Sequence, residues 1–200
     1  MNTDTSKDTI KFSLVMAIHD QTELLRRELP RLLSQEYDNF EVIVIDEHST
    51  EETADVLEQL KAEHPHLYST FVPQYHFQRD TRRLAFTIGA KAAKNEWVIF
   101  IDAESIPASD TWLSELADNC SEENPLMLAY VKQKTGDIRL TCYDNINDAR
   151  RIVSKTEHRR KQDKRQWLRG LKHEYDFIIV RSCYVHKILK FFETTKLQRL

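Results

Sequence analysis

Glycine is scarce in this chain: its 200 residues include only Gly89, Gly136 and Gly170. A phosphate-binding loop of the form GxxxxGK followed by Ser or Thr needs closely spaced glycines, and so does the dinucleotide-binding turn GxGxxG. Both loops bring bare backbone against phosphate. The observed spacing excludes both motifs. If the protein binds a nucleotide, the phosphate charge must be offset in another way, for example by a metal ion held on carboxylates.

Cysteines and long apolar runs are also few. The three cysteines, Cys120, Cys142 and Cys183, are odd in number and have no CxxC spacing, which argues against a disulfide framework or a zinc site and for a reducing compartment. We interpret them as buried or half-buried thiols. Apolar runs such as WVIFI reach only about five residues, whereas a membrane span needs roughly 20. The polar start MNTDTSKDTI does not resemble a signal peptide. We therefore expect a cytoplasmic protein.

Charge is distributed unevenly along the chain. Residues 1–142 carry 14 basic and 25 acidic side chains, a net charge of −11, whereas residues 143–200 carry 15 basic and 7 acidic ones, a net charge of +8. The basic excess is densest between positions 150 and 172. Such a cluster is typical of a peripheral contact with the anionic inner face of a membrane or, equally, of a solvated helix face. We expect no nucleic-acid partner.

Strand and helix signals alternate through the first two thirds of the chain. Short β-rich or apolar runs predict strands, and stretches with helical periodicity between them predict four helices. Thr22 is expected to cap the first, in which Pro30 should cause a kink or mark a break near its start. The Ser49–Glu52 capping box starts the second, the third covers about Arg83 to Lys94, and Ser109 or Asp110 caps the fourth. The predicted strands are 12–18, 40–46, 67–72, 97–102, 126–131 and 177–180. This alternation indicates an α/β fold with a mostly parallel open sheet and helices on both faces.

Carboxylates follow two of the predicted strands. One strand ends in Asp46-Glu47-His48-Ser49 and another in Asp102-Ala103-Glu104. Ligands of open α/β sheets bind at the carboxyl ends of the strands, and side chains two residues apart on a strand point the same way. Asp102 and Glu104 are therefore candidate ligands of a hard divalent cation, Mn²⁺ or Mg²⁺, that would also bridge a diphosphate. Acids are also common at strand ends simply because loops are polar.

Three segments in order, FSLVMAIHDQ, FEVIVIDEHSTEET and TIGAKAAKNEWVIFIDAESIPASDTWL, resemble the family 2 glycosyltransferases over residues 11–115. The family has a second strand ending D-D-x-S and a later strand ending D-x-D. The resemblance implies a donor nucleotide bound at these strand ends, with Asp102 and Glu104 on the metal. The implied nucleotide-binding residues are Ala17, His19, Asp46, Glu47, Arg83 and Asp102. Arg79 and Arg82 belong to the same basic cluster as Arg83. The sequence departs from the family at Glu47, at Glu104 and at Phe86, which stands where an arginine is frequent.

The resemblance also implies a catalytic carboxylate in the second half of the chain. No Glu-Asp pair follows Tyr143, and only Glu174 and Asp176 flank a predicted strand, in HEYDFIIV. These two acids are our candidates for the base that takes the proton of the acceptor hydroxyl. The expected activity is metal-assisted, inverting transfer of a sugar from a nucleoside-diphosphate sugar, UDP-linked in the first instance, to a glycan or lipid-linked acceptor. The alternatives are a shortened relative that only binds nucleotide or a partner, and a basic module on an anionic surface.

Three segments are expected along the chain. Residues 1–10 form a flexible N-terminus, residues 11–142 form the nucleotide-sugar-binding α/β part, and residues 143–200 form a basic, mainly helical acceptor-side segment of the same domain.

Overall fold

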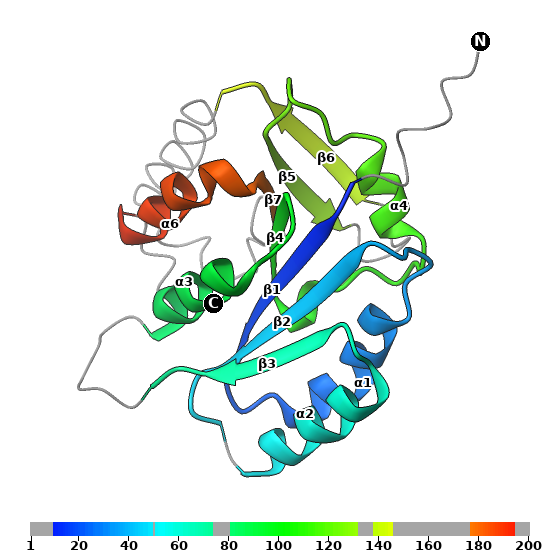
Figure 1. Ribbon diagram of the computed structural model, residues 1–200, viewed down its shortest axis with the longest axis vertical. Helices are drawn as coiled ribbons and strands as arrows, with labels where there is room; N and C mark the ends of the chain where they lie inside the picture. Colours follow the sequence, from blue (N-terminus) through cyan, green and yellow to red (C-terminus); the bar gives the residue numbers. More distant parts are fainter. Residues whose placement is uncertain (1–9, 50, 74–80, 132–137, 146–176, 195–200) are drawn as a thin grey trace, which may run out of the picture.

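A computed structural model describes residues 10–49, 51–73, 81–131, 138–145 and 177–194. These residues form one seven-stranded sheet with helices on both faces (Figure 1). The strands are β1 (Phe12–Ile18), β2 (Phe40–Asp46), β3 (Leu67–Phe71), β4 (Trp97–Ile101), β5 (Leu126–Val131), β6 (Ile138–Tyr143) and β7 (Phe177–Arg181). The predicted fold class is therefore confirmed.

The strand order is β3-β2-β1-β4-β7-β5-β6. Strands β1 to β4 are mutually parallel, while β7 is antiparallel to both β4 and β5, and β6 is antiparallel to β5. Five of the seven strands thus run in one direction. The chain moves outward from β1 to β3 and then returns to the other side of β1 as β4, which creates a topological switch point between β1 and β4.

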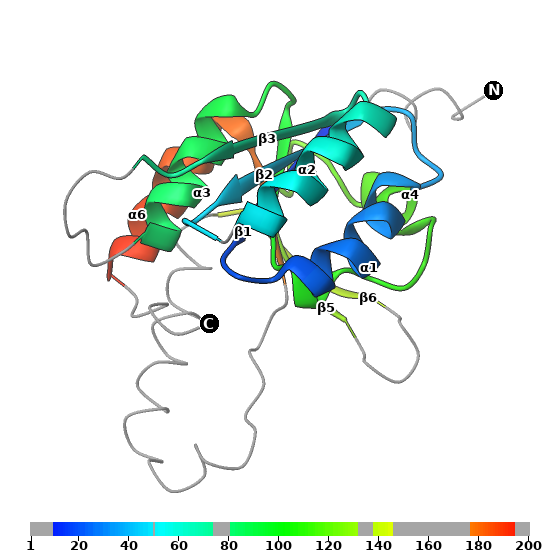
Figure 2. The same ribbon diagram turned by 90° about the horizontal axis from the view of Figure 1, so that it is seen from below.

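Two sets of helices cover the two faces of the sheet, as Figure 2 shows from below. The helices are α1 (Thr22–Leu33), α2 (Glu51–Glu63), α3 (Thr81–Ala92), α4 (Trp112–Ala117) and α6 (Val185–Thr194), with short 3₁₀ turns η2 (Ala103–Ser105) and η4 (Ser182–Tyr184). Buried side chains of α1, α2 and α4 join one core cluster, and those of α3 and α6 join the other.

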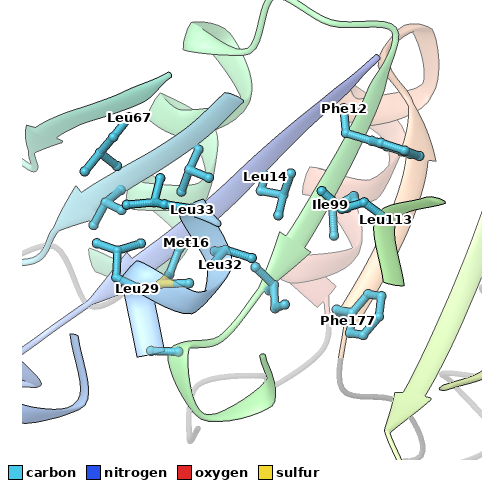
Figure 3. Close-up of a cluster of buried hydrophobic side chains, with 14 of the residues drawn as sticks. Phe12, Leu14, Met16, Leu29, Leu32, Leu33, Leu67, Ile99, Leu113 and Phe177 are labelled. Atoms are coloured by element: carbon cyan, nitrogen blue, oxygen red, sulfur yellow. The ribbon is translucent and has the colours of Figure 1, made fainter. Parts of the chain in front are cut away.

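The central strand β1 is buried along its whole length because both of its faces are covered. Phe12, Leu14 and Met16 belong to the core cluster on the α1 side, where Leu29 and Leu32 lie beside Met16 (Figure 3). Val15 and Ala17 point into the α3 side. Full burial of such apolar side chains contributes about 1.5–3 kcal/mol each. This core holds the strand ends in fixed relative positions.

Helix α3 lies directly on the sheet because Gly89 allows a close approach. A Cβ atom at this position would stand 2.3 Å from Cγ1 of Val15 and 3.3 Å from Cγ1 of Ile45. A larger residue at this position would require α3 or the side chain of Val15 to shift. The contact also fixes where the first turn of α3 lies, beyond the carboxyl ends of these strands.

Several local predictions are corrected. The strand β6 was not predicted, because its alternating, half-exposed residues carry a weak apolar signal. Thr22 is the first residue of α1 rather than its cap, and its hydroxyl hydrogen bonds with that of Thr53. Helix α1 continues through Pro30 to Leu33, so the predicted break does not occur. The N-cap of α4 is Thr111 rather than Ser109 or Asp110. Of the thiols expected to be buried or half-buried, Cys142 and Cys183 are exposed.

The second half of the chain contributes to the centre of the sheet. Strand β7 lies between β4 and β5, and β6 spans the predicted boundary at residues 142 and 143. Residues 1–9 and 146–176 lie outside the described part of the structure. The predicted flexible N-terminus and most of the basic segment therefore stay predictions.

Candidate functional site

The loops that follow β1, β2 and β4 meet at the carboxyl edge of the sheet. Ile18 and Asp46, the last residues of β1 and β2, are paired in register, and the amide of Glu47 donates to the carbonyl of Ile18. Asp102 directly follows β4, the other neighbour of β1. The acids that the sequence indicated therefore lie at one edge, beside the switch point where α/β folds bind ligands.

The first two loops are tied to each other by hydrogen bonds. Nδ1 of His19 lies 2.8 Å from the carbonyl oxygen of Glu47 and donates to it, and the amide of Asp20 donates to the hydroxyl of Ser49 over 2.9 Å. Asp20 and His48 both have positive φ angles, 49° and 65°. Non-glycine residues in this region store about 1–3 kcal/mol and cluster at functional sites.

A buried network joins the β2 loop to the start of α3 and to the end of β4. Glu47 is only 7% exposed, and its Oε2 accepts a hydrogen bond of 2.7 Å from the hydroxyl of Thr81. The guanidinium of Arg82 donates to the carboxylate of Asp102 and lies 4.0 Å from Oε1 of Glu47. Arg82 thus stands between two carboxylates from different strands.

The surroundings of Arg82 combine burial with excess negative charge. Its guanidinium lies 5.6 Å from the ring centroid of Phe86, one turn along α3, and its Nε is buried without a hydrogen-bond partner. Burial lowers the pKa of Arg82 from its ordinary value, while the charges of Glu47 and Glu104 act in the opposite direction. Glu104 is therefore within electrostatic reach of the same guanidinium.

The other implied nucleotide-binding residues lie at this edge in different environments. Oδ1 of Asp46 accepts the amide of Ser49, which orients the half-buried carboxylate within its own loop. Ala17 is completely buried inside β1 and paired with Ile45. His19, with its side chain 58% exposed, is the first residue of that loop open to a ligand. Arg83 is half-buried in the first turn of α3.

Asp102 and Glu104 do not lie on a strand, so the alternation of side chains expected from the sequence does not apply to them. Strand β4 ends at Ile101, and the 3₁₀ turn Ala103–Ser105 carries Glu104 to an exposed position while Asp102 stays half-buried. Within the described residues no group of three or more His, Cys, Asp or Glu is arranged to hold a metal. Mg²⁺ and Mn²⁺ are commonly held by one or two carboxylates together with substrate phosphates and water. The carboxylates of Asp102 and Glu104 have the donor chemistry of such a partial ligand set.

Several predicted functional residues cannot be placed. Glu174, Asp176, Arg79 and the basic cluster at 150–172 lie outside the described residues. Strand β7, however, starts at Phe177, which is paired with Ile101 at the end of β4. Phe177, the first described residue after the candidate bases, thus lies at the carboxyl edge of the sheet. This edge is called the acidic edge below because Asp46, Glu47, Asp102 and Glu104 lie there. None of the described helices combines the length and the apolar character that a membrane span requires.

Thr81 and Arg82 are the contacts at this site that the sequence did not single out. Of the three arginines Arg79, Arg82 and Arg83, the sequence prediction named Arg83 as nucleotide-binding, whereas the structure places Arg82 between the carboxylates. The choice depends on where α3 begins, and the predicted start near Arg83 was two residues later than the observed start at Thr81. If the helix had been predicted to start at Thr81, Thr81 and Arg82 would have been expected beside the strand ends.

The comparison with known families identifies the class of protein. The chain matches Glycosyl transferase family 2 over residues 13–187, which is most of its length, and it belongs to that family. An uncharacterized glycosyltransferase of Nostoc sp. is 27% identical over 97 residues, which cover 48% of this chain and 29% of that protein. The chain thus spans less than a third of the length of this curated relative.

Solved structures share the fold at low sequence identity. The mannosyltransferase PcManGT from Pyrobaculum calidifontis, in complex with GDP-Man and Mn²⁺, has a TM-score of 0.54 at 16% identity, over 64% of this chain and 38% of that one. The glycosyltransferase GlyE of Streptococcus pneumoniae has a TM-score of 0.52 at 10% identity, over 96% and 41%. S. aureus TarS 1-349 in complex with UDP-GlcNAc has a TM-score of 0.50 at 22% identity, over 62% and 35%.

Proposed function

We propose that the protein transfers a sugar from a nucleoside-diphosphate sugar to a glycan or lipid-linked acceptor, with inversion at the sugar carbon. The observation that carries the proposal is the gathering of Asp46, Glu47, Asp102 and Arg82 at the switch point of a family 2 glycosyltransferase fold. The names of two solved relatives, one with GDP-Man and one with UDP-GlcNAc, support this class of donor. We take UDP as the first nucleotide to test.

The residues at the acidic edge suit the parts of such a donor. The exposed ring of His19 and the oriented carboxylate of Asp46 border the space beyond β1 and β2, where we propose that the nucleoside binds. Asp102 and Glu104 would hold a Mn²⁺ or Mg²⁺ ion. When bound, this ion offsets the charge that develops on the leaving diphosphate. The Mn²⁺ named in the mannosyltransferase complex supports the same choice of ion.

Transfer with inversion also needs a base opposite the leaving group. We propose Asp176 or Glu174, which would take the proton from the acceptor hydroxyl as that oxygen attacks the sugar carbon. Asp176 directly precedes Phe177, and Phe177 starts β7 beside Ile101 at the acidic edge. We also propose that the basic residues at 150–172 hold the acceptor side near an anionic membrane, which co-sedimentation with anionic vesicles at low salt tests.

Donor binding is tested by thermal unfolding with UDP and Mn²⁺. A ligand that binds only the native state at 100 times its Kd stabilises it by about 2.7 kcal/mol, so the melting temperature should rise. Glu104→Gln should lose the part of the shift that depends on Mn²⁺, whereas Glu123→Gln, an equally exposed acid outside the site, should keep it. An unchanged shift in EDTA would remove the metal from the proposal, and no shift at all would remove the donor site.

A second candidate is a relative that binds the donor without transferring sugar. It is favoured by Phe86, which stands at a position where the family frequently has an arginine. Here the phenylalanine is buried against Phe100. A turnover assay on protein that binds UDP distinguishes the two candidates. Sugar transfer that falls in Glu174→Gln or Asp176→Asn at unchanged UDP affinity supports the enzyme, and binding without turnover supports the second candidate.

A further inference from the structure

The guanidinium of Arg82 lies among the carboxylates of the acidic edge. Three carboxylates, those of Glu47, Asp102 and Glu104, act on this one cation: Asp102 accepts its hydrogen bond, Glu47 lies 4.0 Å away, and Glu104 is within electrostatic reach. Together these four groups carry a net negative charge. Without such a partner, neighbouring carboxylates repel one another, and most strongly where they are withdrawn from water.

A divalent cation at this edge would compete with Arg82 for the same carboxylate. Asp102 is the acid that the guanidinium contacts, and it is also one of the two acids that we propose hold a Mn²⁺ or Mg²⁺ ion. Two cations on one carboxylate repel each other, so binding of the ion to the nucleotide-free protein is opposed. A diphosphate changes this balance, because its oxygens are strong acceptors for a guanidinium.

Arg82 has the properties of a group that can change partners. It is held by one hydrogen-bonded contact with Asp102 and a longer contact with Glu47, its side chain is 24% exposed, and its Nε has no partner. A guanidinium carries five donors, so it can turn toward phosphate oxygens while keeping a contact with Glu47. Thr81 separately occupies the other oxygen of Glu47, so that carboxylate stays in place.

We propose that Arg82 acts as an internal cation that occupies the metal end of the site in the free protein and leaves Asp102 when a nucleoside diphosphate binds, so that divalent cation and nucleotide bind cooperatively. This inference rests on the proposed donor site and adds that Arg82 couples the binding of its two ligands. Coupling between two ligands is reciprocal: the factor by which UDP raises the affinity for Mn²⁺ equals the factor by which Mn²⁺ raises the affinity for UDP.

The first measurement uses the whole wild-type chain. Titration calorimetry with Mn²⁺ alone, and again with saturating UDP, should show tighter Mn²⁺ binding with UDP, by about 5- to 150-fold as is typical of such coupling. Equal Mn²⁺ affinities with and without UDP would overturn the inference. If UDP does not bind under any condition, the donor site itself fails, and the titrations with Mn²⁺ alone described next still decide the role of Arg82.

The second measurement removes the internal cation. Arg82→Met should bind Mn²⁺ alone about ten-fold more tightly than the wild type, a change in the usual range of site coupling, and the gain from added UDP should shrink. Arg82→Lys keeps a point charge but not the fork that bridges two acids, so an intermediate affinity for Mn²⁺ is expected. A merely structural role would weaken the binding of both ligands.

The matched control is Arg31→Met, which removes the same charge from the exposed pair with Glu28 on α1. It should leave both affinities unchanged. A folded Arg82→Met variant with Mn²⁺ affinity equal to or below that of the wild type would overturn the inference. If Arg82→Met does not fold, Arg82→Lys replaces it. A Mn²⁺ affinity of Arg82→Lys equal to or below that of the wild type, or the absence of coupling in the wild type, would then overturn the inference.

Discussion

The two edges of the sheet both carry acids, but they use them differently. At the amino edge, Oε1 of Glu41 accepts the hydroxyl of Ser13 over 2.6 Å and the amide of Lys94 over 2.8 Å, and the amide of Asn95 donates to the hydroxyl of Ser13. The side chain of Asn95 also donates to the carbonyl of Phe12. These bonds close the turn between α3 and β4 onto the start of β1.

At the carboxyl edge the acids lie around a guanidinium instead. Among the described residues, Glu47, Asp102 and Glu104 all act on the guanidinium of Arg82, and the neighbouring loops contain two non-glycine residues with positive φ. The bonds at the amino edge hold the turn, and we propose that the charge at the carboxyl edge serves a bound ligand. Stability and binding should accordingly respond to different substitutions.

The largest expected effect separates the two edges directly. Asp102→Asn removes one of the two proposed metal ligands and the charge partner of Arg82, so the affinity for Mn²⁺ and UDP together should fall by about 10- to 100-fold. Titration calorimetry measures the loss. The protein should remain folded, because Asp102 is half-buried at a strand end and asparagine can still accept a hydrogen bond from Arg82.

The control for this experiment is Glu41→Gln at the amino edge. It weakens a charge-assisted pair of hydrogen bonds, so urea unfolding should show a loss of about 1 kcal/mol, while the affinity for UDP and Mn²⁺ should stay at the wild-type value. If Glu41→Gln weakens ligand binding as strongly as Asp102→Asn, the separation between a structural edge and a binding edge is wrong.

The next effect concerns the helix that connects the two edges. Gly89→Ala places a Cβ atom 2.3 Å from a side-chain carbon of Val15, which is fully buried in β1. Overpacking of this kind typically costs about 1–3 kcal/mol, which chemical denaturation measures. Because α3 carries Thr81 and Arg82, its displacement should also weaken UDP binding. Ala90→Gly, on the same helix at a half-buried position, should cost only about 0.5–1 kcal/mol and leave binding intact.

The sequence predicted the carboxyl edge better than its internal contacts. Strands with continuous apolar runs and carboxylates at their ends are strong local signals, so β1, β2 and β4 and the positions of Asp46 and Asp102 followed from them. The contact between Arg82 and Asp102 joins residues 20 positions apart. It depends on the first residue of α3 and on the packing at Gly89, and no local pattern reports either of them.

The weakest predictions fell where the strand pattern depends on the rest of the sheet. The run FIIV predicted β7, but its place between β4 and β5 is set by antiparallel pairing with two partners far away in the sequence. Strand β6 lies at the sheet edge with half-exposed residues, so periodicity alone did not reveal it. The burial of Glu47 against Thr81 was not predicted either, because its position in a strand-end loop does not indicate it.

The smallest expected effect lies at the amino edge and concerns pH. His66 directly precedes β3, its Nε2 lies 3.1 Å from the carbonyl of Leu33, and its ring is against those of Phe40 and His64. Burial lowers the pKa of His66 below its ordinary value of 6.5. The Leu33 carbonyl acts in the opposite direction, and His64 adds to the lowering. The unfolded chain therefore takes up a proton at His66 more readily than the native protein does.

Stability rises with pH wherever the unfolded state binds more protons. The contribution of a neutral His66 is thus fully present above the ordinary histidine pKa and is lost as the pH falls below it. Urea midpoints between pH 7 and pH 5 should decline in the wild type and decline less in His66→Gln, whereas the exposed His186→Gln should follow the wild type. UDP binding at pH 7 should be the same in all three proteins, because this histidine lies at the opposite edge from Asp102. A His66→Gln curve parallel to that of the wild type would show that the pH dependence of stability arises elsewhere.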